Sequence, residues 1–289
     1  MADEGSGSIL DKLRYWWDTP IEKIFDKQLA SLTTELNDYN YDDFGFSPEW
    51  VKRSLLFAAL IYRYYFRVEL YGAANLPQGR AVLVSNHSGQ IPIDGAMIST
   101  GLLLEGDPPR ALRSMVERWV PTLPFVSELM PRLGQVLGAP ENARGLLERE
   151  EALLVFPEGV RGINKTFKKR YQLAEFGSGF MRLALETNAP IVPVAVIGAE
   201  EQFPSLANMT KIGKLFGAPG LPLLPQLLVP VLGWAPLPVK YRIHIGEAIR
   251  FTGDANDEDI IIEEKVKAVR ERVQQMINYG LGSRRNIFW

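Results

Sequence analysis

Residues 81–95 read AVLVSNHSGQIPIDG, and the interpretation of the whole chain starts from this stretch. Its first five residues form a short apolar run, which predicts a buried strand over 81–85. A loop containing glycine and proline follows, and a helix is predicted over 95–104. His87 therefore stands at the carboxyl end of a strand, the place where α/β sheets put their ligand sites.

Short apolar runs and helical patterns alternate on the carboxyl side of this stretch. Further strands are predicted at 112–116, 153–156, 191–197 and 239–245, and helices at 172–187 and 258–280. Such alternation favours an α/β fold. We expect a mixed, largely parallel β-sheet flanked by helices, formed by residues 67–289.

The chain before the sheet predicts a helical extension over residues 1–66. Thr19-Pro20-Ile21-Glu22 is a capping box with proline at the first helical position, and Ser47-Pro48-Glu49 begins a second helix that runs towards Phe66. The pair Trp16-Trp17 is typical of a membrane-interface anchor, and it is equally able to pack on the α/β domain. We expect this extension to associate with a membrane.

Composition excludes several classes of function. Lys and Arg number 32 and Asp and Glu 34, a formal net charge of -2, whereas a dedicated nucleic-acid binder usually shows a basic excess. The chain has no cysteine, which excludes thiol nucleophiles, disulfides and cysteine zinc sites. Only two histidines exist, His87 and His244, so a histidine-rich metal site is also excluded. His244 alternates with apolar residues in a predicted strand and is interpreted as a structural or surface residue.

His87 and Asp94 are the candidate catalytic residues. A neutral imidazole can take a proton from an alcohol when a carboxylate fixes its tautomer and stabilises its cation. The alternative is that His87 is a hydrogen-bonded loop residue and Asp94 a helix N-cap.

A second stretch, Val155-Phe156-Pro157-Glu158-Gly159-Val160-Arg161, also follows a predicted strand. It leaves a carboxylate and a guanidinium at the strand end, and it leads into a basic loop made of Lys165, Lys168, Lys169 and Arg170. Such a loop suits a phosphate-bearing ligand or an anionic membrane surface, although a solvated basic loop is the common alternative.

These two stretches, followed by IVPVAVIGAEE over 191–201, resemble the glycerolipid acyltransferase family that includes 1-acylglycerol-3-phosphate acyltransferases. The histidine, FPEG-x-R and hydrophobic blocks occur in family order within residues 68–250. The resemblance implies transfer of a fatty acyl group from acyl-CoA or acyl-carrier protein, as co-substrate, to a lipid hydroxyl. No other cofactor and no metal are implied. His87 would be the general base and Asp94 its partner. The substrate-binding residues would be Asn86, Ser88, Glu158, Gly159, Arg161 and Lys165.

Two departures from the family pattern leave alternatives open. The family usually has four residues between its histidine and aspartate, whereas six lie between His87 and Asp94, so that Pro92 occupies the usual aspartate position. The block over 134–142, which in the family often ends in an arginine for the acceptor phosphate, has no cation before Arg144. A lysophosphatidate-type acceptor is the first expectation. A neutral glyceride, another lysolipid, or a catalytically silent lipid-binding protein are the alternatives.

The membrane is the expected partner, together with the acyl thioester donor. Residues 1–10, MADEGSGSIL, do not predict a secretory signal, and no apolar run reaches the length expected of a bilayer-spanning helix. The segment over 215–238 has no charge and contains six prolines, so it predicts a hydrophobic flap or, alternatively, a buried irregular loop. We expect a peripheral or monotopic protein on the cytoplasmic face of a membrane.

Overall fold

The computed structural model describes residues 25–30, 32, 35–87, 91–118, 120–122, 124–209, 222–229, 233 and 235–288. The expectations for the capping box at 19–22, for Trp16-Trp17, for Ser88 and, within the segment 215–238, for residues 215–221, 230–232 and 234 lie outside these residues and stay predictions.

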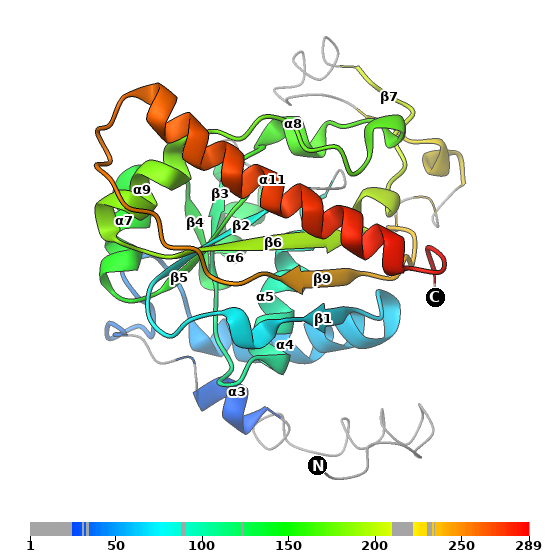
Figure 1. Ribbon diagram of the computed structural model, residues 1–289. Helices are drawn as coiled ribbons and strands as arrows, with labels where there is room; N and C mark the ends of the chain where they lie inside the picture. Colours follow the sequence, from blue (N-terminus) through cyan, green and yellow to red (C-terminus); the bar gives the residue numbers. More distant parts are fainter. Residues whose placement is uncertain are drawn as a thin grey trace.

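A seven-stranded sheet lies at the centre of the molecule in the order β1-β9-β6-β2-β5-β3-β4 (Figure 1). Five neighbouring strands, from β6 to β4, are parallel to one another, while β9 pairs antiparallel with β6, and β1 runs parallel to β9. The strands are β1 (Glu69–Tyr71), β2 (Ala81–Ser85), β3 (Arg113–Val116), β4 (Gln135–Leu137), β5 (Ala152–Val155), β6 (Ile191–Ile197) and β9 (Arg242–Ile245), with a separate antiparallel pair β7 (Ala207–Asn208) and β8 (Pro222–Leu223). The predicted mixed, largely parallel sheet is confirmed.

Helices cover both faces of this sheet: α7, α9 and α11 lie on one side, and α4 and α5 on the other (Figure 1). The α-helices are α3 (Asp26–Ala30), α4 (Pro48–Leu60), α5 (Ile93–Glu105), α6 (Val126–Arg132), α7 (Pro140–Glu148), α8 (Val160–Ile163), α9 (Gly179–Thr187) and α11 (Asp259–Ser283). A π-helical turn continues α4 over Ile61–Tyr65, and 3-10 turns occur at Ala73–Asn75, Val120–Thr122, Phe167–Lys169, Ala199–Glu201 and Pro225–Leu228. None of the helices in the described ranges is both long and apolar enough to cross a bilayer.

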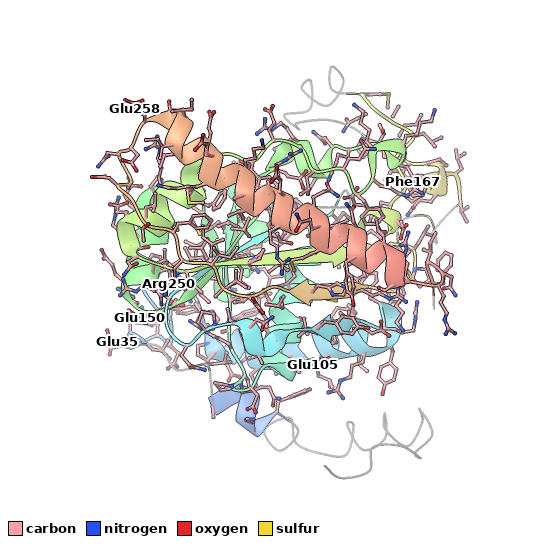
Figure 2. All side chains as sticks on the ribbon, in the orientation of Figure 1. Glu35, Glu105, Glu150, Phe167, Arg250 and Glu258 are labelled. Carbon is pink, nitrogen blue, oxygen red and sulfur yellow. The ribbon has the colours of Figure 1, made fainter. Side chains whose placement is uncertain are left out.

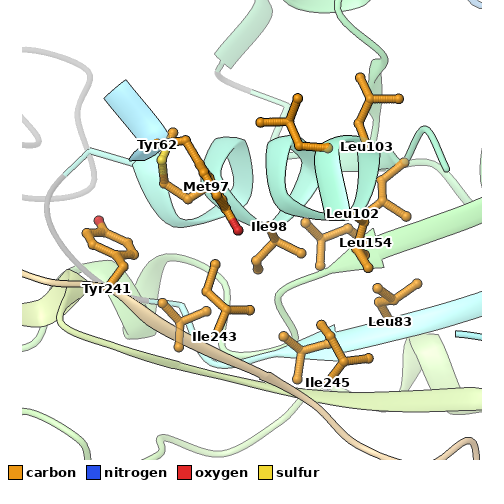
Figure 3. Packing of buried hydrophobic residues seen from close by; sticks show 14 of the residues in the cluster. Tyr62, Leu83, Met97, Ile98, Leu102, Leu103, Leu154, Tyr241, Ile243 and Ile245 are labelled. Carbon is orange, nitrogen blue, oxygen red and sulfur yellow. The ribbon is translucent and has the colours of Figure 1, made fainter. Parts of the chain in front are cut away.

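Because helices bury both faces of the sheet, the central strands are apolar at every position and do not alternate apolar with polar residues. All five residues of β2 are buried, as expected for a parallel strand between two helical layers. Figure 3 shows Ile98 and Leu102 of α5 packed over Leu83 of β2 and Leu154 of β5. Burying each such side chain stabilises the fold by about 1.5–3 kcal/mol, so α5 is firmly held where it leads away from the histidine loop.

The segment before the sheet contributes to this same core. Leu55 and Ala59 of α4, then Tyr62 and Phe66, are buried in the cluster that includes α5. Figure 3 shows Tyr62 beside Met97 of α5. The described part of the predicted extension therefore packs as one layer of the α/β structure. Its division into two domains stays a prediction.

The helix predicted over 172–187 is shorter than expected, because α9 begins only at Gly179. Residues 172–178 are not helical, and their backbone is bonded to other elements. Arg270 of α11 donates hydrogen bonds to the carbonyl oxygens of Leu173 and Ala174. The N–H of Ala174 donates to Glu158. These long-range partners outweigh the local helical pattern.

The carboxyl ends of the five parallel strands lie at one edge of the sheet. In Figures 1 and 2 this is the edge towards which β6 points, and Phe167 lies on that side. Glu258, at the start of α11, lies at the opposite end (Figure 2). The loops that carry the candidate site residues leave the sheet from the first of these edges.

Candidate active site

His87 and Asp94 form a hydrogen-bonded pair just beyond the end of β2. Nδ1 of His87 lies 2.9 Å from Oδ2 of Asp94, and the aspartate side chain is completely buried while 12% of the histidine side chain is exposed. The altered spacing in the sequence therefore does not keep the two residues apart. The contact that a His–Asp dyad needs is present.

Asp94 is held by the first turn of α5. The helix begins at Ile93 with Pro92 as its N-cap residue, so the alternative interpretation of Asp94 as the N-cap is wrong by two positions. Oδ1 of Asp94 accepts the N–H of Gly95 at 2.8 Å, which leaves Oδ2 directed at His87. A carboxylate in this turn is also stabilised by the helix dipole.

The imidazole of His87 is fixed on two further sides. Its ring stacks on Phe156, the residue directly after β5, with the ring centroids 4.2 Å apart and an interplanar angle of 26°. Helix α8 packs so closely that a Cβ atom on Gly162 would lie 2.9 Å from Cβ of His87. Only a glycine fits between α8 and the histidine.

This geometry determines which ring nitrogen is available for chemistry. A carboxylate only accepts hydrogen bonds, so Nδ1 of His87 donates to Asp94. Nε2 then carries the lone pair, as a general base requires. The arrangement is able to take a proton from a hydroxyl group that approaches Nε2.

Glu158 supports the backbone of the histidine loop. Its side chain is buried, with Oε1 accepting the N–H of His87 at 3.0 Å and Oε2 accepting the N–H of Ala174 at 2.7 Å. Glu158 therefore joins the histidine to the segment before α9. The expected contact of Glu158 with substrate stays a prediction.

Lys165 lies between two buried carboxylates. Nζ is 3.2 Å from Oε2 of Glu158 and 3.1 Å from Oε1 of Glu200. Burial raises the pKa of Glu200 to about 7, although the charge of Lys165 acts in the opposite direction. Sequence reasoning did not single out Glu200. The available signal was an acidic pair, Glu200 and Glu201, placed directly after an apolar strand.

Asn86 is enclosed by the sheet. Its side chain is buried, its Nδ2 donates to the carbonyl oxygen of Val196 at 3.0 Å, and its Oδ1 accepts the N–H of Val196 at 2.8 Å. These two bonds continue the β2–β6 pairing beyond the last strand residue. Asn86 therefore fixes the start of the histidine loop, and its expected contact with substrate stays a prediction.

The remaining candidates differ in their exposure. Gly159 adopts a φ of +54°, and a Cβ there would lie 3.0 Å from Oε1 of Glu117, so this carboxylate from the end of β3 lies against the glycine. Arg161 is exposed on α8, with Nη1 3.7 Å from Oε2 of Glu175. Arg144 pairs with Glu186 at 2.8 Å, between α7 and α9.

The second histidine is placed in the sheet. His244 is half-buried in β9 and stacks on Tyr71 of β1, with centroids 4.8 Å apart, and burial lowers its pKa. These contacts fit the structural role expected from its strand pattern.

Comparison with known proteins defines the family. The Acyltransferase family model matches residues 67–197, a range that contains the dyad and Lys165. A protein of Mycobacterium tuberculosis, described as uncharacterized, is 39% identical over 261 residues, which are 87% of this chain and 72% of the relative. The chain belongs to the acyltransferase family. This acyltransferase also resembles a chicken "DGAT1/2-independent enzyme synthesizing storage lipids", with 28% identity over 72% of this chain and 58% of that protein.

The acyltransferase shares its fold with a crystallised member of the family. The 1-acyl-sn-glycerophosphate acyltransferase PlsC from Thermotoga maritima superimposes with a TM-score of 0.53 and 20% identity, covering 81% of each chain. At this identity the likeness establishes the fold. The resemblance drawn from the histidine and FPEG-x-R blocks is confirmed at the level of the family.

Proposed function

We propose that this acyltransferase moves a fatty acyl group from acyl-CoA or acyl-carrier protein to a hydroxyl group of a glycerolipid. The observation that carries the proposal is the 2.9 Å contact between His87 and Asp94 at the carboxyl edge of the sheet. Family membership supports the reaction class, and the absence of cysteine is compatible with direct transfer.

In the proposed reaction, Nε2 of His87 accepts the proton of the acceptor hydroxyl as its oxygen attacks the thioester carbonyl. Asp94 stabilises the imidazolium that forms. The tetrahedral intermediate then breaks its carbon–sulfur bond, and the leaving thiolate takes the proton from His87. The products are an ester and a free thiol, and no covalent acyl-enzyme is formed.

Two acceptor classes have support. The exposed Arg161 favours a phosphate-bearing acceptor of the lysophosphatidate type. A neutral glyceride is favoured by the carboxylate of Glu117 beside Gly159, and by Lys165 and Arg144, whose charges are already paired with carboxylates. The storage-lipid name of the chicken relative points the same way. We place the neutral glyceride first.

We also propose that the enzyme acts at a membrane surface, as a peripheral or monotopic protein. A lipid acceptor has to reach the dyad from a bilayer, and exposed apolar side chains close to the site would assist this. The described segments that follow β6 expose several large apolar residues, namely Leu206, Leu223, Leu227, Leu228 and Val229.

The test is a panel of acceptors offered in vesicles with a labelled acyl thioester, comparing wild type, His87→Ala and His244→Ala. Thiol release is followed, and products are identified by mass spectrometry. We expect ester formation that falls by at least about a hundredfold in His87→Ala and persists in His244→Ala. Full activity in His87→Ala would refute the proposal. Free fatty acid as the product would indicate a hydrolase, and vesicle binding without thiol release would indicate a lipid-binding protein.

A further inference from the structure

Three neighbouring strand ends meet around the catalytic histidine. In the sheet, β2 lies between β6 and β5, and all three strands are parallel. His87 follows β2, Glu158 follows β5, and Glu200 follows β6. The two carboxylates therefore come from the strands on either side of the one that carries the base.

Lys165 joins these two carboxylates. Its ammonium group lies 3.2 Å from Glu158, 3.1 Å from Glu200 and 3.4 Å from the carbonyl oxygen of Gln172. An ammonium group has three hydrogen-bond donors, and three acceptors surround this one. The lysine side chain is only 9% exposed, and those of Glu158 and Glu200 are 0% and 5% exposed. Lys165 is therefore engaged within the protein.

Each charge of Glu158, Lys165 and Glu200 is stable in its buried position only while its partners are present. Two carboxylates held close together repel each other, and a cation between them stabilises both. If one partner of such a buried set is removed, the others are left without compensation and tend to move or take up water. The position of the Glu158 side chain therefore depends on Lys165 and Glu200.

Glu158 connects Lys165 and Glu200 to His87, the proposed base. Its Oε1 accepts the backbone N–H of His87 at 3.0 Å, and α8 leaves no free space at Gly162 on the same side. A shift of Glu158 therefore shifts the backbone that carries the imidazole. Misplacement of a catalytic group by about 1 Å can reduce the rate about a hundredfold.

We propose that Lys165 and Glu200 are positioning residues for His87, acting through Glu158. The inference rests on the proposed role of His87 as general base. It makes Lys165 part of the support of the catalytic loop, whereas the family resemblance placed it among the residues that bind substrate. It also assigns a role to Glu200, which the sequence patterns left unassigned.

The kinetic test compares Lys165→Met, Glu200→Gln and Lys267→Met at pH 8 with the best acceptor from the panel. Lys267 is an exposed lysine of α11 that also contacts a glutamate, Glu271, and is the matched control. We expect kcat to fall about tenfold or more in Lys165→Met, with KM for donor and acceptor within about twofold of wild type. Glu200→Gln should lower kcat about threefold, and Lys267→Met should leave both constants unchanged. A rise in KM with unchanged kcat would show that Lys165 binds substrate and would overturn the proposal.

A second measurement does not depend on activity. The protein contains two histidines, so nitrogen-15 NMR spectra of the imidazoles contain two ring systems, and His244→Ala assigns them. The Nδ1 proton of His87 is held by Asp94 and should be a sharp, downfield signal in wild type and Lys267→Met. It should broaden in Lys165→Met and in Glu200→Gln through faster exchange with water.

A sharp His87 signal in a folded Lys165→Met variant, or in Glu200→Gln if the lysine variant does not fold, would overturn the positioning role. If wild type acylates no acceptor, the proposed function fails, and the NMR comparison still decides whether Lys165 and Glu200 position the ring.

Discussion

Nδ1 of His87 and Oδ2 of Asp94 lie 2.9 Å apart although the two residues are seven positions apart in the sequence. Their contact is set by where β2 ends and α5 begins. The strand places His87 at the sheet edge, and the first turn of α5 holds Asp94 with one oxygen bonded to Gly95. A change in loop length is tolerated because both ends of the loop are fixed by buried elements.

Replacement of Asp94 by asparagine should impair the chemical step strongly. An amide carries no charge to stabilise the imidazolium, and it allows the wrong tautomer of His87. We expect kcat to fall by about a hundredfold or more while the protein stays folded. The measurement is steady-state kcat with circular dichroism as the folding check. Asp107→Asn, at an exposed aspartate that pairs with Lys27, is the control and should be neutral. Equal rates for the two variants would mean that His87 works without a carboxylate partner.

Gly162→Ala should disturb the dyad without altering any polar group. The added Cβ would lie 2.9 Å from Cβ of both His87 and Glu158 and 3.0 Å from the carbonyl oxygen of His87. We expect a loss of about 1–3 kcal/mol in the free energy of unfolding and a lower kcat. Urea unfolding and steady-state kinetics measure these two quantities.

The control for this substitution is Gly179→Ala, where no heavy atom beyond the chain neighbours and the backbone of the same helix lies within 4 Å of the added Cβ. It should leave kcat unchanged. A neutral Gly162→Ala would show that α8 moves away easily and does not confine the histidine.

The sheet was predictable because its central strands are buried on both faces. The runs over 81–85 and 191–197 are apolar throughout, and the structure has β2 and β6 at those same residues. The segment over 172–178 was mispredicted as helix because its decisive partners, Arg270 and Glu158, are distant in the sequence. Local periodicity carries no information about such bonds.

The sequence predicted the catalytic pair of the candidate site better than it predicted which of the other polar residues support the backbone. Histidine after one strand and a carboxylate at the next helix are visible in the sequence. The burial of Asn86 and Glu158 is not, since it depends on Val196 of the neighbouring strand β6 and on Lys165 of another loop. Polar residues near a catalytic histidine look alike in a sequence, whether they face the substrate or support the backbone.

The stability of the protein should depend on pH through Glu200. Burial raises the pKa of this carboxyl group from 4.5 to about 7. The unfolded chain therefore releases the proton at lower pH than the folded protein does. As pH rises from about 5 to about 8, the contribution of Glu200 to the free energy of unfolding therefore falls by up to about 3 kcal/mol.

Glu200→Gln lacks this titration, so its unfolding free energy relative to wild type should increase over the same pH range. Urea unfolding at pH 5, 6, 7 and 8 measures the difference. A constant difference would mean that Glu200 is ionised throughout, held so by Lys165.

The proposed contact with a membrane predicts that exposed leucines beyond β6 contribute to lipid binding. Leu228 is 85% exposed in the 3-10 turn Pro225–Leu228. Burial of a leucine side chain in lipid is worth about 1.5–3 kcal/mol, so Leu228→Asp should weaken vesicle binding by about tenfold or more. Sedimentation with vesicles of mixed neutral and anionic phospholipids measures the fraction of protein that is bound to lipid.

Ile260→Asp is the matched control, because Ile260 is 65% exposed at the start of α11, beside Glu258 at the opposite end of the sheet (Figure 2). If both aspartates weaken binding equally, net charge explains the effect, and the surface beyond β6 is not the one that meets the lipid.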